Sequence, residues 1–319
     1  MGASTAYYLK QQYPIAQVTL LDRTQFPCPL AAAYDLNKII RAEYEDIEYM
    51  KLALEALEIW NVNYKALNLS SPAQLLDPNA AKARFGSIFR NSNWTGVEKC
   101  TYNPQAGWGD ATAALQGVIQ AAIDLGVEYR VATVAKVMFD MHGACTGAET
   151  TNGELLTAVN TVLCAGAHIA KILADSAPDR PEMHVGKRLV AAAAAMGAFR
   201  VPEDEMGKFE DALVLVQPLG KYPGETIPPR PRRLLKCTHE LSFTHSIYHE
   251  ASKQTISVPP ECASQQTWRQ DIPQGLKDEI QIVRNNIYGK YNETLEPEYY
   301  RMCWSDSHAN LALAVHVRC

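Results

Sequence analysis

The first 22 residues combine a helix, a strand and a terminal carboxylate, and this order restricts the fold more than any other feature of the chain. Gly2–Tyr13 has helical period and many small residues, and Pro14 ends it. The small residues are predicted to form a close-packing face, and Ala6, Leu9 and Tyr13 keep the helical period. Val18–Leu21 is a short apolar run typical of a buried parallel strand, and Asp22 follows it. Helix, strand and acid form the second half of a βαβ nucleotide-binding unit, in which the acid meets a ribose.

The beginning of that unit is not in the sequence. A complete unit opens with a strand and a Gly-x-Gly-x-x-Gly turn, and Gly2 stands where the last glycine of that turn belongs. We therefore expect an incomplete nucleotide-binding unit, whose neighbouring strands would carry unpaired backbone groups. Ala158–Cys164 is a second apolar strand that runs into the small-residue turn 165–168, which is again typical of a dinucleotide fold.

Hydrophobic periodicity divides the rest of the chain into a part with helical period and a part with short β-like runs. Helices are predicted over 47–64, 77–84, 109–125 and 271–288, and a strand-like run over 129–140. The helix at 47–64 is expected to turn Met50, Leu54, Leu57 and Trp60 inward. The helix at 271–288 is amphipathic and carries Leu276, Ile280, Val283 and Ile287, and Asp77 is expected to cap the helix that Pro78 begins. Between Val185 and about Thr267, short β-like runs replace the helical period. This change predicts a second, mostly β unit that begins near Pro181.

Composition excludes several classes of function. The chain has 47% hydrophobic and 20% charged residues and a net charge of -5, with no dense run of Lys or Arg, so we expect no nucleic-acid partner. No apolar stretch reaches the roughly 18 to 20 residues that span a bilayer, so we expect a protein of the cytoplasm or peroxisome. The eight cysteines contain no Cys-x-x-Cys pair and no histidine cluster accompanies them, so no metal site is expected.

Three segments carry a resemblance to a known family. They are Gly2–Ala6, Tyr34–Arg41 (YDLNKIIR) and Tyr300–Trp304 (YRMCW). In this order they resemble the FAD-dependent amine oxidases that include sarcosine, pipecolate, saccharopine and fructosyl-amine oxidases, and the fungal-type branch is the most similar. The resemblance implies an α/β (α+β) fold: an incomplete FAD-binding Rossmann-like domain with a mostly antiparallel β substrate domain. It assigns residues 1–180 and 268–319 to the FAD-binding domain and 181–267 to the substrate domain.

The resemblance also implies the roles of individual residues. Cys303 takes the place of the cysteine that joins flavin through its sulfur, and Lys38 that of the basic residue over the flavin face where oxygen is reduced. Arg41 matches an arginine that binds the substrate carboxylate, and a guanidinium fork suits that geometry. Asp22 would hold the adenosine ribose. The other implied cofactor contacts are Gly2, Ser4, Thr5, Arg23, Ala32, Ala33, Asp35, Val134 and Gly166.

The implied reaction oxidises the C–N bond of a secondary amine of an amino acid with O2 and releases H2O2. The partners would be the amine and O2, and we expect a monomer. After Trp304 the sequence departs from the family, which continues through a Thr-Pro-Asp-like segment and a glycine-rich turn. Two alternatives remain at this stage. The chain could be a truncated, inactive remnant that binds no flavin, or a nicotinamide-dependent dehydrogenase, against which Tyr300–Trp304 argues.

Overall fold

The computed structural model describes residues 1–44, 46–60, 74–85, 88–104, 106–186, 188–217, 223–229, 232–260, 272–289, 295–307 and 315–317. Helices and strands are mixed throughout, and most strand pairs are antiparallel, as expected. Within these residues, every helix is too short or too polar to cross a membrane.

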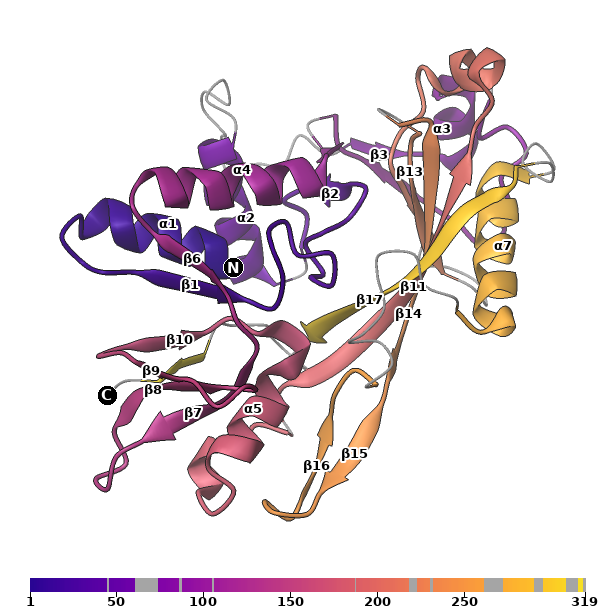
Figure 1. Ribbon diagram of the computed structural model, residues 1–319. Coiled ribbons are helices and arrows are strands. Elements are labelled where there is room, and N and C mark those ends of the chain that lie inside the picture. The colour runs from indigo at the N-terminus through magenta and orange to yellow at the C-terminus, as the bar shows by residue number, and fades with distance from the viewer. Residues whose placement is uncertain are drawn as a thin grey trace.

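The N-terminal residues form the expected helix and strand. Helix α1 (Gly2–Gln12) lies beside α4 (Ala111–Asp124), and β1 (Thr19–Asp22) pairs in parallel with β6 (Glu128–Val131) beneath them (Figure 1). Ala6 is buried against Ala122. Leu9 and Tyr13, which keep the same helical period, are 36% and 52% exposed. The helix contacts α4 through its small residues, so its larger apolar residues are left towards solvent.

Short elements lie between β1 and α4 in the chain. They are β2 (Lys38–Ile40), α2 (Ile47–Trp60), β3 (Gln74–Leu76), α3 (Pro78–Arg84), β4 (Cys100–Tyr102) and β5 (Gly107–Gly109). Asp77 caps α3 through the N–H groups of Asn79 and Ala80, and Pro78 occupies its first turn, which confirms the predicted start. Met50, Leu54 and Leu57 of α2 are half-buried, and residues 61–64 of the predicted helix lie outside the described residues.

A three-stranded antiparallel sheet follows β6. It consists of β7 (Val134–Phe139), β8 (Cys145–Thr150) and β9 (Leu155–Thr157), so the predicted run 129–140 is two strands instead of one. Next come β10 (Thr161–Leu163), the 3-10 turn Gly166–His168, α5 (Ile169–Ser176) and a second 3-10 turn at Pro181–Met183. Strand β18 (Val315–Val317) pairs antiparallel with β10.

The second half of the chain is built on one five-stranded antiparallel sheet. Its order is β12 (Leu215–Gln217), β13 (Gly224–Ile227), β14 (Leu234–Thr244), β11 (Val190–Arg200) and β17 (Pro297–Ser307). A 3-10 helix (Glu203–Phe209) follows β11, and the hairpin β15 (Ser246–His249) and β16 (Gln254–Ser257) extends from β14.

The two faces of this sheet have different neighbours. Helix α7 (Gln274–Tyr288) covers one face and, as predicted, buries Ile280, Val283 and Ile287 there. The other face is turned towards the N-terminal half, where Leu36 packs against Met196 and Ala198 of β11. Long strands therefore place residues from the end of the chain next to residues near its start (Figure 1).

Two glycine substitutions test how tightly α7 packs on the sheet. A Cβ at Gly224 would lie 2.3 Å from Cγ1 of Val283 and 2.7 Å from the carbonyl oxygen of Thr238. We expect Gly224→Ala to lower the free energy of unfolding by about 1–3 kcal/mol through overpacking. Gly117→Ala, at an exposed site of α4 with open space, should raise it by up to about 1 kcal/mol. Denaturant unfolding measures both, and a neutral Gly224→Ala would contradict the described packing.

Candidate active site

The centre of the candidate site is the carboxylate of Asp35, which has no exposed surface. Its Oδ2 accepts hydrogen bonds from Nζ of Lys38 at 2.5 Å and from Nζ of Lys236 at 2.8 Å. Oδ1 accepts from the N–H of Leu36 at 2.7 Å, and the main-chain carbonyl accepts from both the N–H and the hydroxyl of Thr112 at the start of α4. Three elements far apart in sequence therefore meet at one acid.

The charges at this centre hold each other in the ionised form. Burial alone would raise the pKa of Asp35, but the ammonium groups of Lys236 and Lys38 hold that pKa below its usual value. Burial alone would lower the pKa of Lys38, but the Asp35 carboxylate and then the nearby Cys303 raise it. The side chain of Lys38 is 47% exposed, whereas that of Lys236 is 5% exposed. Lys38 is therefore the cation of this pair that a bound molecule can reach.

The register of the five-stranded sheet brings Cys303 to the same centre. Met196 of β11 lies opposite Arg301 of β17, and Ala194 lies opposite Cys303. Ala198, on the same side of β11 as Met196, lies opposite Lys236 of β14. Directly opposed residues share a face of an antiparallel sheet, so Cys303, Arg301 and Lys236 all project from the face that is turned towards Asp35. The structure thus brings together Lys38 and Cys303, 265 positions apart.

Arg301 connects this strand to the chain segment that precedes Asp35. The side chain is 3% exposed. It donates hydrogen bonds to the main-chain carbonyls of Tyr34 and, at 2.8 Å, of Ala31. A charge beside the acidic residues of this region would ordinarily form a surface ion pair, but here it is buried against a turn. Ala32 and Ala33, which were predicted to approach the cofactor, lie between the two carbonyls that Arg301 holds.

The predicted nucleotide-binding residues gather at a second centre, where β1 and β10 end. Oδ1 of Asp22 accepts from the N–H of Arg23 at 2.7 Å. The guanidinium of Arg23 lies 3.5 Å from Nε2 of His168, which closes the 3-10 turn that begins at Gly166. Gly166 has a φ of +53°, in the left-handed region that favours glycine. A Cβ at Gly2 would lie 3.3 Å from Cβ of Cys164, so the start of α1 packs closely on the end of β10.

The remaining predicted residues lie at the start of α1, at the start of β7 and past the end of β2. Ser4 and Thr5 lie in the first turn of α1, whose free N–H groups form a natural anion site. Val134 is the first residue of β7. Two positions before it, the N–H of Ala132 donates to the main-chain carbonyl of Asp22 at 2.8 Å. Arg41 is exposed past the end of β2, with its guanidinium 5.1 Å from the ring of Tyr44.

These two centres fit the two ends of a flavin nucleotide. A helix N-terminus, a carboxylate and small residues suit a pyrophosphate and a ribose. A thiol and a cation of raised pKa suit a ring that gains negative charge. Both polar atoms of the Asn37 side chain are buried without a partner in the described part of the chain, which leaves hydrogen-bonding capacity beside Lys38. The residues present are therefore compatible with FAD.

Two residues of these centres were missed in the sequence. Lys236 lies in a strand of mixed polar and apolar residues 201 positions after Asp35, so nothing local distinguishes it from a lysine pointing outwards. The acid in the segment YDLNK was the only available signal, because a buried carboxylate requires a second cation. His168 ends the small-residue turn 165–168, two positions after Gly166, which is predicted to contact the cofactor.

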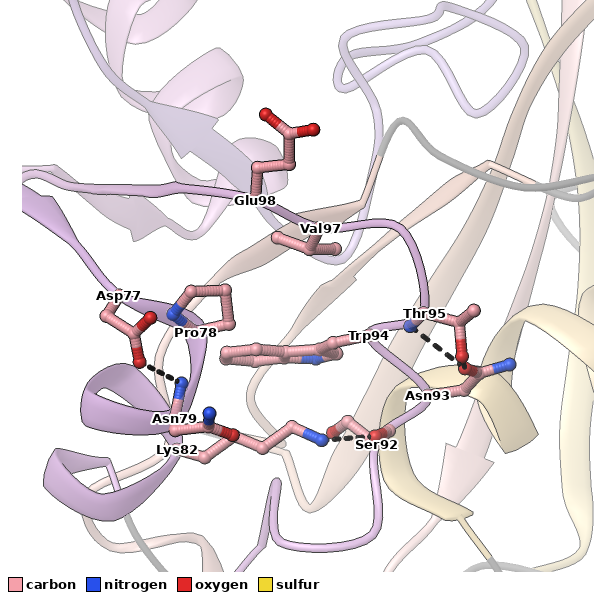
Figure 2. A pocket seen from close by; sticks show the side chains of 10 residues that line it. All are labelled: Asp77, Pro78, Asn79, Lys82, Ser92, Asn93, Trp94, Thr95, Val97 and Glu98. Carbon is pink, nitrogen blue, oxygen red and sulfur yellow. Dashed lines mark hydrogen bonds between the residues drawn. The ribbon is translucent and has the colours of Figure 1, made fainter.

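A separate pocket of about 470 Å³ lies beside α3. Figure 2 shows the indole of Trp94 lying across it, with the stem of Lys82 beneath. Nζ of Lys82 is 5.1 Å from the Trp94 ring and donates to the carbonyl of Ser92 at 2.7 Å. The described residues of this pocket include none of the predicted site residues, and α3 lies on the opposite side of the molecule from α1 and β1 (Figure 1).

Comparison with known proteins identifies a family and a curated relative. Residues 62–222, half of the chain, match the family described as FAD dependent oxidoreductase. The chain is 23% identical over 305 residues to the L-saccharopine oxidase of Schizosaccharomyces pombe. The match covers 81% of this chain and 67% of that protein.

Solved structures share the fold. A modified fructosyl peptide oxidase from Aspergillus nidulans superposes with a TM-score of 0.80 at 23% identity, over 97% of this chain and 78% of that one. The fructosamine oxidase of Aspergillus fumigatus (Amadoriase II) gives a TM-score of 0.77 at 19% identity, over 97% and 74%. This likeness confirms the mixed α and β fold with an antiparallel sheet.

Neutralising Asp35 should destabilise the protein strongly. Asp35→Asn leaves Lys236 buried without its carboxylate, and such a change costs about 3–5 kcal/mol of unfolding free energy. Asp35→Asn combined with Lys236→Met should recover much of that loss. Glu48→Gln, which breaks an exposed ion pair with Lys51, is the control and should cost less than about 1 kcal/mol. Denaturant unfolding checks all three, and equal effects of Asp35→Asn and Glu48→Gln would refute the central role of Asp35.

His168 should make stability depend on pH. Burial, and then the positive charges of Arg23 and Lys171, lower the pKa of His168 from 6.5 to about 4. Between these values the unfolded chain binds a proton that the folded protein does not, so stability falls as the pH falls from 6.5 to 4. His168→Gln should flatten this part of the curve, whereas His142→Gln, at an exposed site, should keep it. Urea midpoints measured across this range test the difference, and parallel curves for wild type and His168→Gln would contradict it.

Proposed function

The chain belongs to the FAD dependent oxidoreductase family, and on this premise we propose that it oxidises the C–N bond of a secondary amine with O2. Bound FAD would accept the electrons of the C–H bond beside the nitrogen, giving an imine that water hydrolyses, and would return them to O2 as H2O2. The protein supplies orientation and charge around this chemistry.

The two centres described above support the placement of the cofactor. We assign the adenosine and pyrophosphate end to Asp22, Arg23 and Gly166, with Val134 near the adenine and with Gly2, Ser4 and Thr5 at the start of α1. We assign the flavin ring to the face that carries Cys303, beside Ala32, Ala33, Asp35 and Lys38. Residues 1–180 and 268–319 would then form the cofactor domain and 181–267 the substrate domain.

One observation carries the proposal: the Asp35 carboxylate that holds Lys38 also binds Lys236, which projects from the same sheet face as Cys303. An ammonium that keeps its charge is needed where O2 accepts an electron, because it stabilises the superoxide anion that forms. Asp35 keeps Lys38 protonated and fixes its position. Cys303 lies opposite Ala194, whose small side chain leaves room on the sheet face for a planar ring. We propose that the sulfur of Cys303 is bonded to that ring.

The substrate class follows from the relatives and from Arg41. Those relatives are named for saccharopine, fructosyl peptides and fructosamine, in which the reacting nitrogen carries two carbon substituents. Arg41 stands three positions after Lys38, is exposed and can offer its guanidinium fork to a carboxylate. We therefore propose an N-substituted amino acid, R-NH-CHR′-COO⁻, as the substrate, acted on by a monomer.

A peroxide assay tests this function directly. The full chain, supplied with FAD, is mixed with sarcosine, pipecolate, saccharopine and a fructosyl amino acid in turn, and H2O2 release is measured. We expect release with at least one of these amines and none with the corresponding primary amino acids. A protein that stays colourless after incubation with FAD and releases no peroxide would disprove the proposal.

Cys303 should determine whether flavin is bound covalently. After acid precipitation the wild-type pellet should remain yellow, because a thioether survives acid. Cys303→Ser should bind flavin that is lost into the supernatant. Cys100→Ser, at a partly exposed thiol of β4, is the control and should leave the pellet yellow. Absorbance of the two fractions gives the result, and a yellow pellet from Cys303→Ser would place the bond elsewhere.

A further inference from the structure

We infer that Arg301 is a positioning residue, which fixes the chain segment 31–38 to the strand that carries Cys303 and so sets the sulfur against the flavin. This inference rests on the proposed function, since it concerns how the cofactor is attached. The guanidinium of Arg301 donates to the carbonyls of Ala31 and Tyr34, while the thiol of Cys303 lies two residues further along the same strand.

The contact has a geometry that only arginine provides. Ala31 and Tyr34 close a turn, in which the N–H of Tyr34 donates to the carbonyl of Ala31 at 3.0 Å. Nη1 and Nη2 of Arg301 reach one carbonyl each, across the two ends of this turn. A guanidinium is a rigid planar fork, whereas an ammonium is a single point on a flexible stem. Lysine at this position would keep the charge but would present one nitrogen, on a flexible stem, in place of the two fixed nitrogens that reach the carbonyls.

The rest of the segment is anchored independently. Nζ of Lys236 binds Oδ2 of Asp35 at 2.8 Å and the carbonyl of Asn37 at 3.0 Å. Arg301 and Lys236 project from β17 and β14, which flank β11 on the same face of the sheet. Loss of Arg301 therefore releases the turn at 31–34 and leaves Asp35 in place. The segment would remain folded but would lose its alignment with Cys303.

Alignment is critical for the attachment reaction. The S–H bond of the thiol and one C–H bond of a flavin methyl group break, an S–C bond forms, and O2 takes up the two hydrogens and two electrons as H2O2. Reacting atoms must approach to about 3–3.5 Å for such a step, and a misplacement of about 1 Å can cost roughly a hundredfold in rate. A residue that aligns the segment can therefore control attachment without touching the reacting atoms.

The experiment compares Arg301→Lys and Arg301→Met with wild type in the full chain supplied with FAD. We expect total bound flavin to stay close to wild type, while the acid-stable fraction falls by roughly tenfold in both variants. In flavin-free protein, chymotrypsin should cleave after Tyr34 roughly tenfold faster in both variants, because the turn opens locally. Far-UV circular dichroism verifies folding, and if Arg301→Met does not fold, Arg301→Lys carries the test.

The matched control is Arg200, an arginine of the neighbouring strand whose Nε pairs with Glu298 at 2.9 Å on the surface. Arg200→Lys and Arg200→Met should leave both readouts unchanged. Wild-type behaviour of Arg301→Lys in both assays would overturn the inference, since charge alone would then suffice. If wild type retains no flavin, the proposed function fails. The chymotrypsin rates then still test the positioning role of Arg301, because equal rates in wild type and Arg301→Lys would overturn it.

Discussion

A carboxylate without exposed surface has to be neutralised where it lies, and this requirement at Asp35 organises the molecule. A buried unpaired charge costs several kcal/mol, so Asp35 can be placed only where cations are also placed. Lys38 comes from its own segment, and Lys236 comes from β14 of the large sheet. The N-terminal half and the antiparallel sheet are therefore joined by an ion pair that neither can form alone.

The same requirement explains how the site acquires its charge. One acid faces two lysines, and the guanidinium of Arg301 lies close enough to Lys38 to affect its pKa. Positive charge is therefore in excess on the sheet face that carries Cys303. Such a surface stabilises negative charge that develops during a reaction. The burial of Asp35 thus serves stability, and the excess of cations around it serves the proposed chemistry.

Local signals in the sequence predicted the elements of the fold well. The opening helix, strand and acid, the cap at Asp77 and the buried face of α7 all depend on neighbours within a few residues. Errors arose where tertiary packing decides. The run 129–140, for example, is divided between two sheets. The motifs were sufficient to propose Lys38 and Cys303. They did not indicate Lys236 or the carbonyl contacts of Arg301, and no sequence pattern encodes a bond to a main-chain oxygen 267 positions away.

The long sequence separation of these contacts has a consequence for the order of events during synthesis. Lys236 leaves the ribosome 201 residues after Asp35, and Arg301 and Cys303 follow 65 and 67 residues after Lys236. At about 5–20 residues per second, roughly 15–50 s pass between the emergence of Asp35 and that of Arg301. Lys38 emerges directly after Asp35, but the buried ion pair that joins the two halves can form only after Lys236 has emerged.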